Sequence, residues 1–251
     1  MTIPLQTGVM YGPLESRRFG KSLGVNLLPS DQKVCSFDCL YCQYGRTRLG
    51  KPVRFPEAAE VEEEASRFFS SAGDRREEIR WIMIAGNGEP TLHPEFPKIV
   101  RMLKSLRDRW FPQVPIGILS NSATCHWTDI HDSLSLLDGR FMKLDAGSPD
   151  VLGAVNQPLN KNIWPQMIGG LYRLRHIVLQ SLFVRGDTDN TSEKIVEDWI
   201  HTVAYIRPES VQLYTIDRPP AEGSVQSVER TRLEAIAARL REKTQIPSFV
   251  F

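Results

Sequence analysis

Short apolar runs alternate along this chain with longer stretches in which apolar residues return every three or four positions. Nearly continuous apolar runs are typical of parallel strands covered on both faces, and the longer periodic stretches are typical of amphipathic helices. The pattern predicts strands at Leu23–Leu28, Trp81–Ala85, Ile116–Ser120, Phe141–Asp145, His176–Phe183 and Val211–Thr215. It predicts helices at Pro56–Ser70, Glu95–Arg109, Trp127–Leu137, Ile163–Leu174, Ser192–Ile206 and Val228–Lys243.

This alternation predicts repeated βα units around a parallel sheet. Six units suggest an incomplete version of the (β/α)8 barrel, and a doubly wound open sheet is the alternative. The terminal segment IPSFVF is a candidate seventh strand. With 251 residues and 41 % apolar composition, the chain can bury one full core. We therefore expect a single α/β domain over residues 1–251, including a C-terminal helix and strand at 228–251.

The net charge is +1, so the charge of the whole chain argues neither for nor against a polyanionic partner. Local charge is less even, because the segment 17–54 holds eight basic residues and only two acidic ones, Asp31 and Asp38. The basic residues are Arg17, Arg18, Lys21, Lys33, Arg46, Arg48, Lys51 and Arg54. This stretch suits a phosphate or a nucleic acid, but solvated loop charges would give the same pattern.

The chain contains no run approaching the roughly 18 apolar residues of a membrane span, and the segment MTIPLQTG lacks the layout of a signal peptide. We expect a cytoplasmic protein with no membrane partner. Reduced cysteines fit that compartment, where glutathione and thioredoxin oppose disulfides.

Three of the four cysteines, Cys35, Cys39 and Cys42, stand together in the run VCSFDCLYCQYG with the spacing C-x3-C-x2-C. Three thiolates on one loop can bind three irons of a cubic iron–sulfur cluster and leave the fourth iron open. Structural zinc needs four protein ligands, and no fourth Cys or His follows within a short loop. The spacing favours a cluster, with zinc and unreactive thiols as the alternatives.

The cysteine run, with Tyr41 before the last cysteine, resembles the cluster loop of the radical S-adenosylmethionine (SAM) superfamily. The segment GNGEP, residues 86–90, follows an apolar run and resembles the family's glycine-rich segment that binds the SAM amino group. The resemblance implies a partial (β/α)6 barrel, one [4Fe–4S] cluster, bound SAM and a reducing partner such as flavodoxin or ferredoxin. It also implies that Tyr41 packs beside the adenine and that Ser120 and Asn121 lie near the ribose or the carboxylate.

The segments 11–29 and 212–223 resemble a subgroup related to the tRNA wyosine-base synthases. Those enzymes hold a second cluster with further cysteines, whereas this chain has only Cys125 beyond the first three, which excludes a second three-cysteine cluster. The resemblance makes four residues of these segments candidates for substrate contacts: Arg17, Arg18, Asp217 and Arg218. An Arg–Asp pair between the two segments would explain the same residues without a ligand.

The candidate residues share a position, because each group follows a predicted strand and carboxyl ends of parallel strands lie at one edge of the sheet. We expect one cavity lined by the cysteines and by Gly86, Asn87, Gly88, Glu89, Ser120, Asn121, Lys143, Asp145 and Tyr214. Glycines allow close backbone approach, and Glu89 can accept a hydrogen bond from an ammonium group. Lys143 and Asp145 can orient SAM or the substrate, or form a structural ion pair.

Three functions stay open at this point. The first is a radical SAM enzyme that abstracts hydrogen through a 5′-deoxyadenosyl radical from an unidentified substrate, for which a nucleotide or an RNA base is one option. The second cleaves another SAM bond and transfers an aminocarboxypropyl or methyl group. The third is a metal-binding module without turnover. The two SAM motifs together favour the first.

Overall fold

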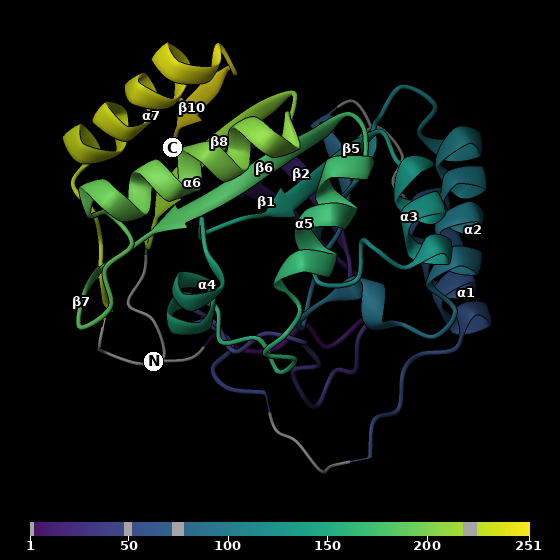
Figure 1. Cartoon of the computed structure of the whole chain (residues 1–251). Coiled ribbons are helices and arrows are strands. Elements are labelled where there is room, and N and C mark those ends of the chain that lie inside the picture. The colour runs from purple at the N-terminus through teal and green to yellow at the C-terminus, as the bar shows by residue number, and fades with distance from the viewer. Residues whose placement is uncertain (1–2, 48–51, 72–77, 218–224) are drawn as a thin grey trace.

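A computed structural model describes residues 3–47, 52–71, 78–217 and 225–251. Its centre is one curved sheet of eight strands with helices packed on its outside (Figure 1). The sheet strands, in spatial order, are β1 (Met10–Ser16), β2 (Gly20–Val25), β3 (Trp81–Ile84), β4 (Ile116–Ser120), β5 (Gly139–Lys143), β6 (Ile177–Phe183), β8 (Ser210–Thr215) and β10 (Ser248–Val250). A separate antiparallel ribbon joins β7 (Arg185–Gly186) to β9 (Val225–Gln226).

The strand order decides between the two architectures that the sequence allows. β1 pairs with β2 antiparallel, and each of the following strands adds parallel to the one before it, out to β10. A doubly wound sheet needs a point where this order reverses, and the described strands contain none. The fold is therefore a single α/β domain with the parallel arrangement of a partial barrel, and the candidate seventh strand is confirmed as β10.

The helices are α1 (Ala58–Ser70), α2 (Phe96–Trp110), α3 (Thr128–Ser135), α4 (Pro149–Val155), α5 (Trp164–Arg173), α6 (Glu193–Ile206) and α7 (Arg230–Thr244), with a short 3₁₀ helix, η2 (Pro90–Leu92). Successive helices pack side by side, α1 on α2, α2 on α3, α5 on α6 and α6 on α7. Figure 1 shows α5 and α6 in front of the strands, α1 to α3 near one edge and α7 at the other. The six long helices that the sequence predicts are all present; α4, η2, β1 and the β7–β9 ribbon were not predicted.

Two predicted strands are displaced. The strand predicted at Leu23–Leu28 is β2, which ends at Val25. It ends there because the Asn26 side chain forms hydrogen bonds with both the N–H and the carbonyl of Leu28, which turns the chain. The strand predicted at Phe141–Asp145 is β5, which ends at Lys143, so Asp145 lies in the following loop and not in the strand.

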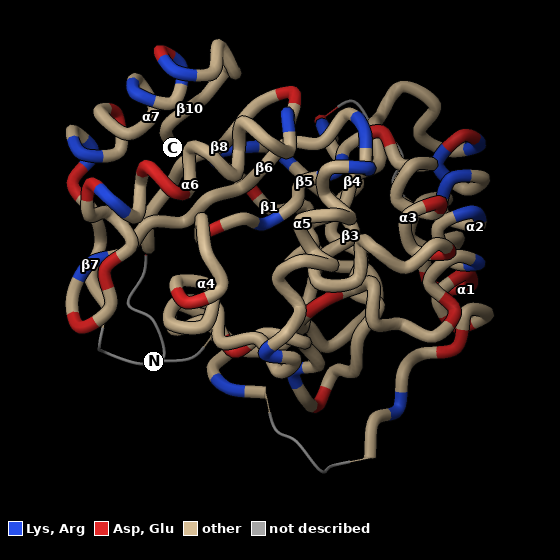
Figure 2. The backbone as a smooth tube through the Cα atoms, viewed as in Figure 1, with Lys and Arg blue, Asp and Glu red and all other residues tan. Residues whose placement is uncertain are grey.

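The core is continuous between the sheet and the helices, and fully buried aromatic rings such as Phe69, Phe96 and Trp199 fill it. Charges lie on outward faces (Figure 2), and α6 and α7 are joined by ion pairs between Glu193 and Glu197 on one helix and Arg239 on the other. Among the helices in the described part of the chain, none is long and apolar enough to cross a membrane.

Gly147, between β5 and α4, offers a test of this packing. A Cβ at this position would overlap backbone atoms of Asp198 and Trp199 in α6, which cannot rotate away. We expect Gly147→Ala to lower the free energy of unfolding by about 1–3 kcal/mol, measured by urea denaturation. The matched control is Gly153→Ala inside α4, where a Cβ meets nothing within 4 Å and helix propensity should add up to about 1 kcal/mol. Equal effects of the two substitutions would contradict the packing described here.

Candidate active site at the carboxyl edge of the sheet

Two adjoining cavities lie at the carboxyl ends of the parallel strands. The inner cavity, of about 240 Å³, is lined by Arg18, Lys33, Cys35, Phe37, Cys39, Tyr41, Cys42, Tyr44, Gly86, Gly88, Glu89, Leu119, Ser120, Asn121, Lys143, Gln180 and Tyr214. The outer cavity, of about 430 Å³, shares eight of these residues and adds, among others, Arg17, Leu182, Ile216 and Asp217. The structure thus brings together most of the residues that the sequence proposes: all three cysteines line the inner cavity, Cys42 lines both, and Arg17 and Asp217 line the outer one.

The cysteine loop is fixed by backbone hydrogen bonds. The N–H of Cys42 donates to the carbonyl of Cys39 at 3.0 Å, which closes a tight turn. The N–H of Leu40 donates to the carbonyl of Val155 at 3.0 Å, so the loop rests on the end of α4. This short helix, which the sequence analysis missed, therefore supports the cysteines.

Two buried amides point at cysteine sulfurs. Nδ2 of Asn121 lies 3.5 Å from Sγ of Cys35, and Nδ2 of Asn156 lies 3.4 Å from Sγ of Cys39. Asn156 is completely buried at the end of α4, and its Oδ1 has no hydrogen-bond partner. N–H donors directed at sulfur stabilise the thiolate form, which is the form that binds metal.

The cysteines fit a cluster by their chemistry and position. All four cysteines of the chain are free thiols, and the three of the loop line one cavity. Burial raises the pKa of Cys35 to about 12 and that of Cys39 above its ordinary value, so both are thiols until a cation replaces the proton. Among the described residues, no three Cys, His, Asp or Glu side chains converge tightly enough to enclose one metal ion. A cubic cluster presents a separate iron to each thiolate and needs no such convergence.

Lys33 is a charged neighbour of this loop that the sequence analysis did not single out. Its buried Nζ donates to the carbonyl of Gly45 at 2.7 Å and lies 3.4 Å from Oδ1 of Asp38. Burial lowers the pKa of Lys33, but Cys42, Cys35 and Asp38 outweigh that cost and hold the pKa above its ordinary value. A fixed positive charge therefore lies beside the thiols.

The segment 86–89 docks on the cysteine loop through its backbone. The N–H of Val34 donates to the carbonyl of Asn87 at 3.0 Å, and the N–H of Glu89 donates to the carbonyl of Val34 at 2.9 Å. Gly88 has φ = +141°, and a Cβ there would collide with the carbonyl of Val34. A Cβ at Gly86 would collide with the Asn26 side chain. Both glycines are required by close packing at this crossing of chains.

Glu89 is a buried carboxylate that accepts hydrogen bonds from three neighbouring residues. Oε1 accepts from Oγ1 of Thr91 at 2.6 Å and from Oγ of Ser120 at 3.0 Å, and Oε2 accepts from the N–H of Asn121 at 2.5 Å. Burial raises the pKa of Glu89, although these hydrogen bonds oppose the rise. The carboxylate joins the loop after β3 to the loop after β4.

Asn87 is also buried, but it does not line the inner cavity. Its Nδ2 donates to the carbonyls of Gln6 and Pro29 at 2.9 and 2.8 Å, and its Oδ1 accepts from the N–H of Gln6 at 2.8 Å. The side chain therefore holds the N-terminal segment against the cysteine loop and is not available to a ligand in this arrangement.

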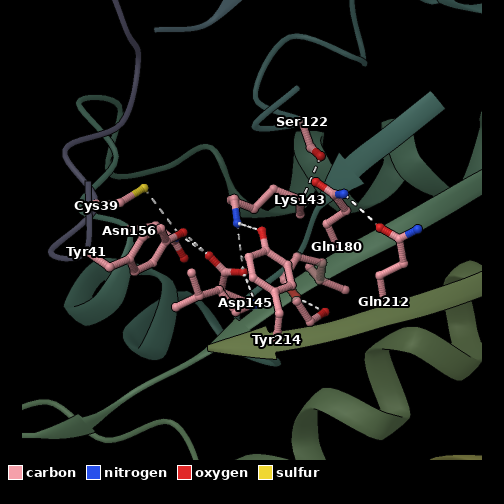
Figure 3. A network of polar contacts seen from close by, with 12 residues as sticks. Cys39, Tyr41, Ser122, Lys143, Asp145, Asn156, Gln180, Gln212 and Tyr214 are labelled. Carbon is pink, nitrogen blue, oxygen red and sulfur yellow. Dashed lines mark hydrogen bonds and ion pairs between the residues drawn. The ribbon is translucent and has the colours of Figure 1, made fainter. Parts of the chain in front are cut away.

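A polar network around Asp145 forms the floor of the cavities (Figure 3). The Asp145 carboxylate accepts from Oη of Tyr41, from Nδ2 of Asn156 at 2.6 Å and from the N–H of Leu182 at 2.7 Å. Nζ of Lys143 lies 3.3 Å from Oδ1 of Asp145 and donates to the Tyr214 hydroxyl at 2.9 Å. Asp145 thus does not itself line the cavities, but it holds in place Lys143 and Tyr41, which do.

Lys143 stays charged in this network. Burial lowers its pKa, but Asp145 and Tyr214 raise it further, so the pKa lies well above the ordinary value. The ammonium group is a fixed cation in the wall shared by both cavities.

The candidate substrate residues have different surroundings: two of them pair with each other, and one packs on an aromatic ring. Arg17 and Asp217 form an exposed ion pair at 3.3 Å between the β1–β2 turn and the end of β8. Arg18 instead stacks on the Tyr214 ring, with its Cζ 4.3 Å from the ring centroid. Arg218 lies outside the described residues.

Asn156 and Tyr44, which the sequence analysis does not name, contact a cysteine or line the inner cavity, and so does Lys33, which it names only as part of the basic stretch. Of these three residues, only Lys33 could have been found from the sequence, because it lies two positions before the first cysteine in the basic stretch. His93 is packed in the structure, where its Nε2 contacts the carbonyl of Pro56 at 2.8 Å and its Nδ1 accepts from the N–H of Glu95.

Comparison with known proteins gives concordant results. A family model described as the radical SAM superfamily matches residues 30–198. The chain is 27 % identical over 236 residues to a Brachyspira hyodysenteriae protein named GTPase Obg, covering 92 % of this chain and 33 % of that protein. It is 31 % identical over 218 residues to a UPF0026 protein of Helicobacter pylori strain J99, covering 84 % and 67 %. The chain thus spans a third of the first relative and about two thirds of the second.

The fold is similar to a solved structure of TYW1 with a lysine–pyruvate adduct bound. The TM-score is 0.66 at 14 % identity, over 89 % of this chain and 74 % of that chain. At this identity the likeness shows the fold.

Glu89→Gln tests the buried carboxylate. The amide NH2 would replace an acceptor and face a donor, so we expect a loss of about 1–3 kcal/mol of unfolding free energy at pH 5, measured by urea denaturation. Because burial raises the pKa of Glu89, its contribution to stability is fully present below the unfolded pKa near 4.5 and is lost as pH rises through the raised pKa. Gln does not titrate, so the difference in unfolding free energy between wild type and Glu89→Gln should become smaller as the pH rises from 4.5 to 7.5.

The control for this series is Glu62→Gln on the exposed face of α1, which should change the unfolding free energy by less than about 0.5 kcal/mol. A gap between wild type and Glu89→Gln that is the same at every pH would show that folding leaves the proton affinity of Glu89 unchanged.

Proposed function

The chain belongs to the radical SAM superfamily and is an enzyme of that type, and from this premise we propose that it cleaves SAM reductively and abstracts hydrogen from a substrate in the outer cavity. The observation that supports the proposal is the direct backbone contact between Val34, beside the three-cysteine loop, and the segment 86–89, since residues of both motifs line the inner cavity.

Cys35, Cys39 and Cys42 would hold one [4Fe–4S] cluster. The fourth cysteine, Cys125, is fully buried with its Sγ 3.7 Å from the carbonyl of Met167, and it lines neither cavity. It is therefore not a ligand in this proposal. Asn121 and Asn156 direct N–H groups at two of the three sulfurs, and Lys33 places a positive charge beside the loop.

When bound, the cluster and SAM supply one-electron cleavage of a carbon–sulfur bond, giving methionine and a 5′-deoxyadenosyl radical that takes a hydrogen atom from the substrate. The chain's own residues would bind and orient SAM. In this proposal Gly86 and Gly88 permit close approach, and Glu89, Ser120 and Asn121 form the wall beside the methionine end. Tyr41 and Tyr214 contribute aromatic faces, and Asp145 and Asn87 hold neighbouring groups in place.

Lys143 supplies a cation where the two cavities meet, within reach of a SAM or substrate carboxylate. Glu89, Ser120 and Asn121, which line the inner cavity, are themselves buried, at 1, 6 and 8 % exposed. A reductant such as flavodoxin or ferredoxin would deliver the electron, and a nucleotide or RNA base is one substrate class that the cavity's tyrosines suit.

The first test is product analysis. Anaerobic reconstitution with iron and sulfide, followed by dithionite and SAM, should yield 5′-deoxyadenosine by chromatography. Cys39→Ala should abolish the product because it removes one of three cluster ligands. Cys125→Ala, a buried cysteine outside the cavities, should retain it. Methylthioadenosine in place of 5′-deoxyadenosine would support group transfer instead, and retained zinc with indifference to SAM would support a binding module.

The second test concerns Asn156. Removing an N–H donor to a cluster sulfur makes the reduced state less favourable, so Asn156→Ala should lower the cluster's reduction potential by roughly 50 mV, since 59 mV corresponds to about 1.4 kcal/mol for one electron. The measurement is a potentiometric titration followed by electron paramagnetic resonance (EPR).

The control for the second test is Gln212→Ala, which removes a buried amide that bonds Gln180 and contacts no sulfur. It should leave the potential near the wild-type value. An unchanged potential in Asn156→Ala, with the cluster content of wild type, would show that Asn156 does not act on the cluster.

A further inference from the structure

Adjacent arginines in the β1–β2 turn have different surroundings. The Arg17 side chain is 60 % exposed and is neutralised by Asp217, which is 58 % exposed, at 3.3 Å. Arg18 forms no ion pair with any described carboxylate, and its Nη1 is buried without a hydrogen-bond partner. Buried guanidinium N–H groups in folded proteins are normally paired, so an orphan donor at a cavity wall indicates a site that a ligand completes.

The flat face of the Arg18 guanidinium packs on aromatic rings, which holds the group in place. Its Cζ lies 4.3 Å from the centroid of the Tyr214 ring and 5.6 Å from that of Phe19. The Tyr214 hydroxyl accepts from Lys143, which fixes the ring. Stacking uses the face of the guanidinium and leaves its N–H groups, which lie in the plane, free to bind the two oxygens of an anion.

Among the described residues that line the outer cavity, Arg18 is the cation without an ion-pair partner. Lys143 is paired with Asp145, and Arg17 is paired with Asp217. In the described part of the chain, the one other acidic residue in the lining is Glu89, which lies in the inner cavity and whose carboxylate accepts from Thr91, Ser120 and Asn121. The electrostatics thus favour an anionic ligand group.

The other residues that line the outer cavity indicate what the rest of the ligand is like. Four tyrosines, Tyr11, Tyr41, Tyr44 and Tyr214, line the outer cavity together with apolar side chains, including Leu119, Leu182 and Ile216. A cavity of about 430 Å³ with this lining suits a small molecule or a terminal group with a flat or apolar body.

We propose that Arg18 binds an anionic group, a carboxylate or a phosphate, of the substrate that occupies the outer cavity, while Arg17 serves only as an ion-pair partner of Asp217. The proposal rests on the proposed function for the presence of a substrate, but anion binding itself requires no turnover. Arg18 also lines the inner cavity, so the carboxylate of SAM is the competing partner that the experiment must separate.

The test is thermal unfolding of the anaerobically reconstituted protein in increasing inorganic phosphate or acetate, with potassium chloride at matched ionic strength as reference. A ligand that binds the folded state raises Tm, by roughly 3 °C at tenfold excess over Kd for a chain of this size. Wild type should respond to at least one of the two anions, and comparison of the two distinguishes phosphate from carboxylate recognition. Arg18→Gln should lose the response, whereas Arg17→Gln, the matched neighbour, should keep it.

SAM binding by calorimetry is the second measurement, and it also reports folding of each variant. Arg18→Gln should bind SAM with a Kd within about threefold of wild type. Loss of SAM binding in folded Arg18→Gln would assign the guanidinium to SAM and overturn the proposal. An anion response that is absent in wild type, or equal in wild type and Arg18→Gln, would also overturn it. Failure of wild type to form 5′-deoxyadenosine would instead refute the proposed function and leave the anion result standing.

Discussion

The candidate site depends on one crossing of chains, where Val34 pairs through its backbone with the segment 86–89. This contact attaches the cysteine loop directly to the end of β3. It requires glycine at position 88, because φ is +141° and the carbonyl of Val34 occupies the space of a side chain. A backbone contact of this kind fixes position more firmly than a side-chain contact, since it leaves no rotamer freedom.

The second constraint is the neutralisation of the buried Asp145 carboxylate behind the wall of the cavities. Asp145 is 1 % exposed and is balanced by Lys143, while Tyr41, Asn156 and the Leu182 N–H satisfy its remaining lone pairs. Because a buried carboxylate is costly unless every oxygen is paired, this network tolerates little movement. It joins Tyr41 on the cysteine loop to β5, β8 and α4, and so couples the loop to three further elements of the barrel.

The parts of the fold that the sequence predicts are those with strong periodicity or local spacing. The parallel strands and six long helices follow from apolar patterning, and the cysteine loop and segment 86–89 follow from motifs. The short helix α4 was missed, although Ser148, Pro149 and Asp150 form a local start signal with the Ser148 hydroxyl as cap. The ribbon β7–β9 has two residues in each strand and carries no periodic signal. Side-chain roles were hardest, because Asn156 meets Cys39 across 117 positions of sequence and Arg18 differs from Arg17 only in its tertiary contacts.

In the proposed enzyme, the cysteine loop carries a cluster beside the site where SAM binds. The most direct measurement is the EPR spectrum of the reduced, reconstituted protein with and without SAM. We expect a reduced [4Fe–4S] signal whose g values shift when SAM is added, and no such signal in Cys39→Ala, which lacks one of the three ligands. A wild-type spectrum that SAM leaves unchanged, or the absence of a cluster signal in protein with all three cysteines intact, would contradict this proposal.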